Sequence, residues 1–321
     1  MQNRIQLIAA AAALTCAGMA QAGVAFDANL ELDITNRSGK ATEGAAPAFQ
    51  SGVNTGGRVE INANAELLKN GDNYVTARGT LIVPVNGTAV TIDDAWIKFG
   101  NSTVDFKAGR HEAADLFPVG KDTVLDLASP AGYRANVLRG RVIDGRLHAV
   151  LGLNASSALR FELGVVSEDK NDSLLAAPTK AYGARPTVVY TAGPLALRAG
   201  VESYKIGATS YNGVGLSGGY ALGTDGNVNV NYARRTSDNA TIADASSFGL
   251  NLVYGPAGIG YVKDKNDAVG AAAAVDISTV YAAYSFPLMG VKGATVTPAI
   301  SHSTGNNTDL TEFRVRFNYA F

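Results

Sequence analysis

Cysteine is almost absent from this chain, since the single one, Cys16, lies within the first 22 residues. That segment carries one positive charge, Arg4, then an apolar run and the ending Ala-Gln-Ala, which is the pattern of a cleaved secretory signal peptide. A lipoprotein is the alternative, but the three residues before Cys16 make a poor lipobox. We therefore expect 1–22 to be removed and 23–321 to fold without disulfides.

Long apolar runs and a charge bias are also missing. No stretch after residue 22 approaches the ~18–20 apolar residues that a membrane helix needs. The richest, GAAAAV at 270–275, is short and mostly alanine. Without Arg4, the 27 Lys and Arg residues fall to 26 against 28 acids, a net charge of −2. This balance argues against nucleic acid as a partner.

Catalytic and metal-binding patterns are lacking as well. The three histidines, His111, His148 and His302, are scattered and have no metal-ligand spacing. Ser301 and Ser303 flank His302, but adjacent residues of a strand point to opposite faces, so they form no nucleophile–base pair. The glycine-rich stretch at 213–219 has no helix after it and is no phosphate loop. We expect no enzyme, no cofactor and no metal.

What the chain does have is alternation of period two from end to end. In GVAFDANLELDIT, which begins at Gly23, apolar residues share one face and acidic or amide residues share the other. The last ten residues, EFRVRFNYAF, alternate aromatic or apolar with charged side chains. A soluble sandwich also alternates, but it usually has shorter strands. A membrane barrel turns its apolar face to lipid and its polar face to water, and this reading predicts that Arg314 and Arg316 point into water.

The strand count supports a closed barrel. A hairpin around Asp144 and Gly145 would raise the count to 17, and we reject it because it puts a long loop on the short-turn side. Short Gly-, Pro- or Asn-rich turns alternate with long connections, as expected when both termini are periplasmic. Pro186 and Pro298 fall inside predicted strands, where each removes a ladder hydrogen bond and suggests a bulge. The predicted strands number 16, an even count, and lie near 23–35, 57–68, 74–84, 88–99, 103–110, 141–153, 157–166, 182–191, 195–205, 213–222, 227–236, 246–254, 258–264, 276–286, 293–302 and 312–321.

Several motifs carry a family resemblance. GGRVEINANAELLKNGDN is similar to the second strand of porins, and DDAWIKFGNSTVDFKAGRHE resembles a porin hairpin that ends in Gly-Arg. The terminal Phe321 resembles the signal that the barrel assembly machinery reads. The chain thus resembles the Gram-negative general-diffusion porins, outer-membrane barrels of 16 antiparallel strands. The resemblance implies a homotrimer, for which Ala63, Ala65, Ala77 and Gly79 on the apolar face are a weak hint.

The resemblance also implies an inward-folded constriction loop after the fifth strand, here about 111–140. Acids of this loop would face arginines of the wall across the narrowest point and set up a transverse field. By strict alternation, Arg110 and Arg141 fall on the lipid-facing side, so each needs a bulge or must lie where its strand leaves the ladder. The predicted constriction residues are Arg58, Arg78, Arg110, Arg141, Glu112, Asp115, Asp122 and Asp126.

The resemblance implies an outer-membrane channel for passive diffusion of small hydrophilic solutes and ions, embedded in lipid. A substrate-selective channel for sugars or small organic acids stays open as the alternative, with Tyr74, Trp96, Phe117 and Tyr133 as a sparse aromatic track. A non-channel structural barrel or adhesin is a further alternative. The sequence alone does not choose among them.

Overall fold

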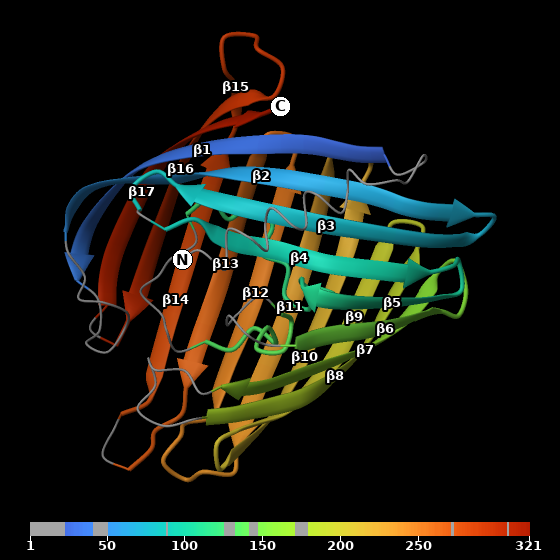
Figure 1. Cartoon of the computed structure of the whole chain (residues 1–321). Helices are drawn as coiled ribbons and strands as arrows, with labels where there is room; N and C mark the ends of the chain where they lie inside the picture. Colours follow the sequence, from blue (N-terminus) through green and yellow to red (C-terminus); the bar gives the residue numbers. More distant parts are fainter. Residues whose placement is uncertain are drawn as a thin grey trace.

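The computed structural model describes residues 23–40, 51–87, 89–124, 132–140, 147–170, 179–270, 273–306 and 308–321. They form one antiparallel sheet that closes on itself, because β1 (Gly23–Lys40) pairs with both β2 (Gly52–Asn70) and β17 (Thr308–Ala320) (Figure 1). The expected signal peptide and residue Asp126 lie outside the described residues. No helix among the described residues is long and apolar enough to span a membrane.

The other strands follow in chain order around the barrel, each paired with its neighbours in sequence except that β14 and β15 both pair with β16. They are β3 (Asn73–Pro84), β4 (Thr91–Gly100), β5 (Val104–Arg110), β6 (Leu147–Asn154), β7 (Leu159–Lys170), β8 (Thr179–Ala192), β9 (Leu195–Ile206), β10 (Thr209–Leu222), β11 (Gly226–Ser237), β12 (Ala245–Tyr254), β13 (Ala257–Asn266), β14 (Val275–Tyr284), β15 (Phe286–Pro287) and β16 (Ala294–Gly305).

The barrel has 16 strand positions, because the two-residue β15 continues β14. Both pair with β16 in one unbroken register, Ala283 with Ala299 and Phe286 with Val296. Pro298 lies opposite the gap between them and has no N–H to donate to the ladder, which explains the split. The predicted 16-stranded antiparallel barrel is confirmed, with several strands two to five residues longer than expected.

The two strand prolines interrupt ladders without shifting them. Around Pro186, the pairs Ala184–Ser203 and Thr187–Gly200 belong to one register, so the ladder to β9 only skips two residues. The bulges suggested by the prolines are therefore absent. The register shifts instead between Glu66 and Leu68 in β2 and between Gly79 and Leu81 in β3.

Alternation along each strand separates an outer apolar face from an inner polar one. In β10, Leu216 is 45% exposed while its neighbour Ser217 is 6% exposed. Exposed aromatic side chains gather at strand ends beside the short turns, where amphipathic rings favour the membrane interface; they are Tyr190, Tyr220, Tyr254, Tyr284, Tyr319 and Phe321. The short turns, such as Gly193–Pro194, lie at this end of the barrel, which their length predicts to be the periplasmic one.

The end of the chain completes the closure. Phe321 donates its backbone N–H to the Ala28 carbonyl at 3.0 Å, and Ala28 donates its own to the Phe321 carbonyl at 2.9 Å. In lipid every backbone group needs a partner, so the final strand has to pair with the first. The alternating aromatic strand at the end of the sequence is thus the seam of the barrel.

Candidate functional site

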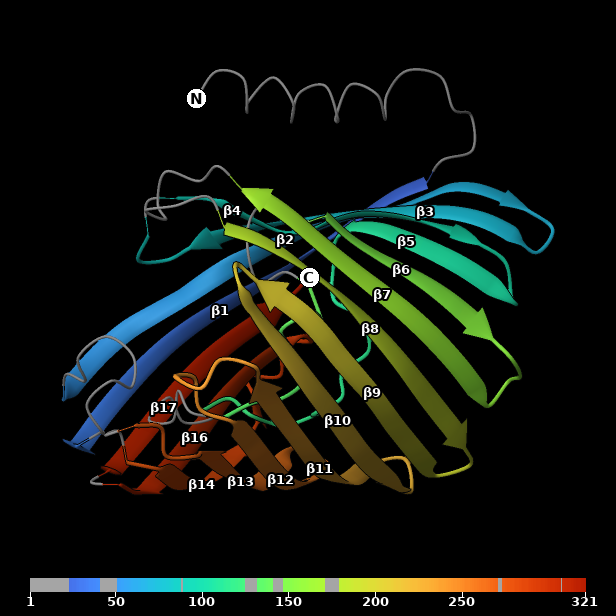
Figure 2. The same cartoon turned by 90° about the horizontal axis from the view of Figure 1, so that it is seen from below.

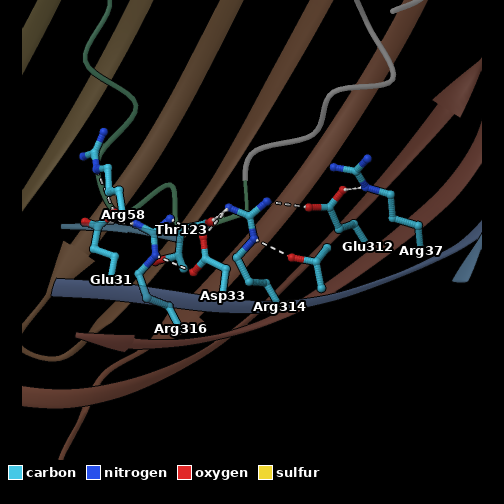
Figure 3. Close-up of polar contacts among 9 residues, drawn as sticks. Glu31, Asp33, Arg37, Arg58, Thr123, Glu312, Arg314 and Arg316 are labelled. Carbon is cyan, nitrogen blue, oxygen red and sulfur yellow. Dashed lines mark hydrogen bonds and ion pairs between the residues drawn. The ribbon is translucent and has the colours of Figure 1, made fainter. Parts of the chain in front are cut away.

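A chain of ion pairs lines the inner face of the barrel from β17 across β1, β2 and β3 to β4, and Figure 3 shows its part on β17, β1 and β2. Arg316 binds Asp33 through two bonds, from Nε and Nη2, of 2.8 and 2.9 Å. Arg314 donates to Glu312 at 2.9 Å, and Arg37 donates to the other oxygen of Glu312 at 2.6 Å. The Arg316–Asp33 and Arg37–Glu312 pairs join two strands that are about 280 residues apart in sequence, so they form only when the barrel closes.

The same chain continues across β2 and β3. Arg58 lies 3.1 Å from Glu31 and 3.6 Å from Glu60, and Arg78 lies 3.6 Å from Glu60 and 3.3 Å from Asp94. We call the whole set the charge ladder. Its members alternate in sign and comprise five arginines and five carboxylates, so their formal charges cancel; they are Arg37, Glu312, Arg314, Asp33, Arg316, Glu31, Arg58, Glu60, Arg78 and Asp94.

The opposite wall, from β8 to β14, is built differently. Its inner positions carry mainly small or neutral side chains, among them Ala233, Asn231, Ser247, Asn251 and Thr279, which are all at most 3% exposed. The connection between β5 and β6 packs on this wall: its buried apolar side chains cluster with Ala233, and its Pro118 carbonyl accepts from Asn231 and Asn251. In Figure 2 the green trace of this connection lies within the ring of strands. The described parts of this connection, 111–124 and 132–140, are called the inner loop below.

Glycines on this wall make room for the inner loop. A Cβ at Gly200 would lie 2.6 Å from Leu116, and one at Gly215 would lie 2.5 Å from Ala135. A Cβ at Gly258 would lie 2.5 Å from the Lys121 side chain. Real Cβ atoms do not approach so closely, so any larger residue would displace the loop. Leu116 is fully buried as a result.

Buried polar contacts fix one part of the inner loop, made of Ala114 and residues 133–138, to β8 and β9. Glu202 is fully buried and accepts hydrogen bonds from Tyr133 at 2.6 Å, the Leu138 N–H at 2.8 Å and Arg185 at 3.2 Å. Arg185 is 1% exposed and also donates to the loop carbonyls of Ala114 and Ala135, at 2.8 and 3.2 Å. Burial raises the pKa of the Tyr133 hydroxyl, which stays protonated as the donor. A buried ion pair is stable only with such additional hydrogen bonds.

A second part of the inner loop, residues 118–123, is held through its carbonyl groups. Asn231 and Asn251 both donate to the Pro118 carbonyl, at 2.7 and 2.8 Å. Tyr281 donates to the Val119 carbonyl at 2.6 Å. On the other side, Arg314 of the charge ladder donates to the Thr123 carbonyl at 2.8 Å. These loop carbonyls are thus satisfied by protein groups, as backbone at membrane depth must be.

The predicted arginines occupy two kinds of position. Arg58 and Arg78 belong to the charge ladder, and their carboxylate partners lie on the wall. Arg110 is the last residue of β5 and follows Gly109, whose φ is 119°, a conformation that favours glycine. Arg110 still pairs with Ala95 of β4, so its predicted place in the constriction stays a prediction. Arg141 lies outside the described residues.

The predicted loop acids have partners that the sequence did not indicate. Glu112 and Asp115 lie 3.1 and 3.7 Å from Arg139, a residue of the same loop. The side chain of Asp122 is exposed to the interior of the barrel. Partial desolvation there nevertheless raises the pKa of its carboxyl above the ordinary value, although the charges of Arg316 and Arg134 act to lower it. Their predicted role in setting charge selectivity is not decided by these contacts.

Sequence reasoning missed Asp33, Glu202, Arg185 and Arg139. Asp33 could have been found, because it alternates with Glu31 on the polar face of β1, which closure places beside the last strand. Arg185 stands next to Pro186, and its inward direction follows from the alternation in β8. Its pairing with Glu202 depends on register, which the sequence does not state.

The four aromatic residues considered for a sugar track do not form one. Phe117 and Tyr133 are 3% and 2% exposed, buried between the inner loop and the wall. Lys107 lies over the Trp96 ring at 4.2 Å and Lys98 over the Tyr74 ring at 5.4 Å, which is cation–π geometry. Among the residues that the structure describes, no group of three or more His, Cys, Asp or Glu side chains could hold a metal ion.

A family model described as porin-like glycoporin RafY matches residues 25–156, which include the inner loop and part of the charge ladder. Among solved structures, the trimer form of the Vibrio cholerae outer-membrane protein OmpT is similar, with a TM-score of 0.69, 14% identity and 94% of this chain covering 99% of that chain. The chain has the barrel of a Gram-negative outer-membrane porin.

A mutant of the porin from Rh. blastica agrees with this porin barrel, with a TM-score of 0.60, 13% identity and 93% of this chain covering 100% of that chain. At such identities the structural likeness shows the fold. The search of curated proteins gives no significant match. The family model covers less than half of the chain, and together with the structural matches it supports a porin-type barrel.

Proposed function

We propose that this porin is a water-filled channel for passive diffusion of small hydrophilic solutes and ions, narrowed by the inner loop. The observation that carries the proposal is the asymmetric interior. The loop is packed on the small-residue wall, and the arginines of the charge ladder stay partly exposed, with Arg58 at 42% and Arg78 at 31%. Solutes would pass between the loop and the ladder, and no catalysis is involved.

Charge cancellation within the ladder supports low discrimination between ions. Each arginine has a carboxylate neighbour on the wall, so the field that reaches the pore water is that of alternating charges, which decays faster than that of a single sign. A solute with polar groups of both kinds would find partners along the ladder. Stacking on free aromatic faces, which a sugar-selective channel would use, finds no support among the four candidate rings.

Assembly and export complete the proposal. The chain would be exported by the signal peptide 1–22, inserted by the barrel assembly machinery through β17, and would form a homotrimer. Similarity to a trimeric structure of OmpT supports the last point. Chemical cross-linking in mild detergent tests the homotrimer. Recovery of the monomer alone would contradict it.

Liposome swelling tests the transport role. Purified protein is inserted into vesicles, and the swelling rate is measured with sugars of increasing size. Diffusion through a water-filled pore predicts a rate that falls smoothly with solute size and rises linearly with concentration. Saturable uptake of one sugar, with others of equal size excluded, would contradict general diffusion.

A further inference from the structure

An apolar groove of about 620 Å³ lies on the outer face of the barrel across β11 to β14 and β16. Outward aliphatic side chains form its sides, and Leu250, Ile259, Val280 and Ile300 are 43–56% exposed. Ala282 stands between Ile259 and Ile300 in the paired strands, and its small side chain forms the floor. An aliphatic chain lying in this groove would be in contact on several sides, whereas on a flat barrel surface it would be in contact on one side only.

Cationic side chains cap the groove at its extracellular end. Lys263 and Lys265 of β13 both point outward, since the alternate residues Val262 and Asp264 are buried inside. They share one carboxylate, Asp276, at 3.2 and 3.5 Å, and their side chains are 39% and 51% exposed. Two exposed ammonium groups beside one carboxylate favour an additional anion.

Register places a further arginine in the same row. Arg234 of β11 is opposite Ser246, and Ser246 is opposite Lys265, so three neighbouring strands present a polar row at one height. Arg234 is 52% exposed and pairs with Asp244 at 3.3 Å. The cap therefore contains three cations and two of the carboxylates that contact them, all close to the extracellular strand ends.

Hydroxyl and imidazole groups connect the cap to the groove. Lys263 is opposite Ser278, and the Ser278 hydroxyl lies 3.0 Å from the Tyr261 hydroxyl. His302 is exposed and lies 3.0 Å through Nδ1 from the Thr311 hydroxyl. Tyr261 and His302 also line the groove itself. Polar hydrogen-bond donors on the lipid-facing side are costly unless a polar partner reaches them.

We propose that this groove and its cap form a binding site for a phosphorylated glycolipid of the outer leaflet, of the lipid A type. An acyl chain lies in the groove over Ala282, and a phosphate contacts Lys263 and Lys265. The chemistry of the site commits to this occupant: the groove accepts hydrocarbon, the cap accepts an anion, and the short turns place the cap at the extracellular end. A neutral lipid satisfies only the groove.

Native mass spectrometry of the folded barrel in mild detergent tests the site, with lipid A as the probe. The double variant Lys263→Gln/Lys265→Gln should weaken binding of the tightest lipid A by roughly 25-fold, about fivefold for each charge near the surface. Ala282→Phe should also release it, because the ring fills the groove. Lys292→Gln, which removes an exposed lysine at the periplasmic end, and Ala199→Phe, in a second outer groove, should leave binding unchanged.

Parallel titrations with phosphatidylglycerol and with an uncharged diacylglycerol separate the occupants. Both should bind more weakly than lipid A. The proposal would be overturned by any of three results. Either lipid could bind as tightly as lipid A, the Lys292 control could lose as much binding as the double variant, or the double variant could bind lipid A unchanged. Retained heat-modifiable migration of each variant on a gel shows that its barrel is folded. Cross-links through Ser278→Cys between two chains would mean that a second copy covers the face, which also overturns it.

Discussion

The two halves of the barrel interior solve opposite problems with the same alternating strands. From β17 through β1 to β4, the inner face carries charged side chains that pair with one another, and its arginines stay partly exposed. From β8 to β14, it carries mainly glycine, alanine, serine and asparagine, with the buried Arg185–Glu202 pair, and the inner loop packs on it. The small wall binds a segment of protein, and the charged wall remains for water. The two walls differ in the size and charge of their side chains, because both have the same antiparallel backbone.

Energetics differ between the halves as well. Partly exposed ion pairs contribute about 0–1 kcal/mol each, so the charge ladder adds modestly to stability. The Arg185–Glu202 pair is fully buried, and removal of one partner leaves an uncompensated charge. We therefore expect the loop side to be sensitive to single changes and the ladder side to be tolerant, with effects on ion flow.

Deletion of residues 115–130 should have the largest effect, because it removes the element that distinguishes the two halves. A 16-stranded barrel without a loop inside encloses a wide aqueous channel, so single-channel conductance should rise by roughly twofold or more. The measurement is made in planar bilayers, with a shortened connection between β7 and β8 as control. Unchanged conductance in a folded barrel would mean that the loop does not narrow the pore.

Glu202→Ala should loosen the loop and leave the barrel intact. Arg185 loses its carboxylate, which costs about 3–5 kcal/mol for a buried pair, and Tyr133 loses its acceptor. We expect protease cleavage within the inner loop and a noisier open-channel current. Glu162→Ala is the control, because Glu162 accepts one loop N–H, from Ala114 at 3.3 Å, and is not fully buried. Equal resistance of both variants to protease would contradict the anchoring role.

Gly215→Val should act by overpacking the small wall. The new side chain meets Ala135 and Leu116, and overpacking of this kind costs about 1–3 kcal/mol. The matched control is Gly218→Val in the same strand, because a Cβ there meets only Leu197, at 3.6 Å. Thermal unfolding should separate the two variants, with the lower midpoint for Gly215→Val. Identical midpoints would indicate that the loop does not press on β10.

Charge changes on the ladder should have a smaller effect. Arg58→Ala leaves the ladder with one excess negative charge, so the reversal potential in a salt gradient should shift toward cation preference, by less than roughly twofold in permeability ratio because salt screens charges beyond ~8 Å. Arg58→Lys keeps the charge and should shift it less. In the inner loop, Asp115→Ala removes a negative charge and should shift preference toward anions. A shift of the opposite sign in either variant would remove these residues from the pore lining.

The smallest expected effect concerns pH. Because the pKa of Asp122 is raised, its carboxyl takes up a proton at a higher pH than an ordinary aspartate does. As pH falls through that raised value, the pore loses one negative charge and preference shifts toward anions. The folded state then binds more protons than the unfolded chain, so this group adds stability as pH falls. In Asp122→Asn this step should vanish; its persistence would assign the titration to another group.

Much of this fold follows from the sequence by simple physics. The period-two alternation predicted the strands, and their even number predicted a closed barrel. The polar face of the last strand correctly predicted that Arg314 and Arg316 point into the barrel. The pairing of Arg316 with Asp33 could not be predicted, because it depends on the register between first and last strand. The small wall was equally hidden, since Gly200 and Gly215 have meaning only once Leu116 lies against them.

The account's central claim is that water reaches the charged wall and not the wall beneath the inner loop. Because 23–321 contains no cysteine, single cysteines can report this directly. Reaction of Arg58→Cys with a charged thiol reagent should reduce the current within seconds. Ser247→Cys, 1% exposed in the wild type and close to Gly132, should stay unreactive until residues 115–130 are deleted. Rapid reaction at position 247 in the intact loop, or none at position 58, would contradict the account.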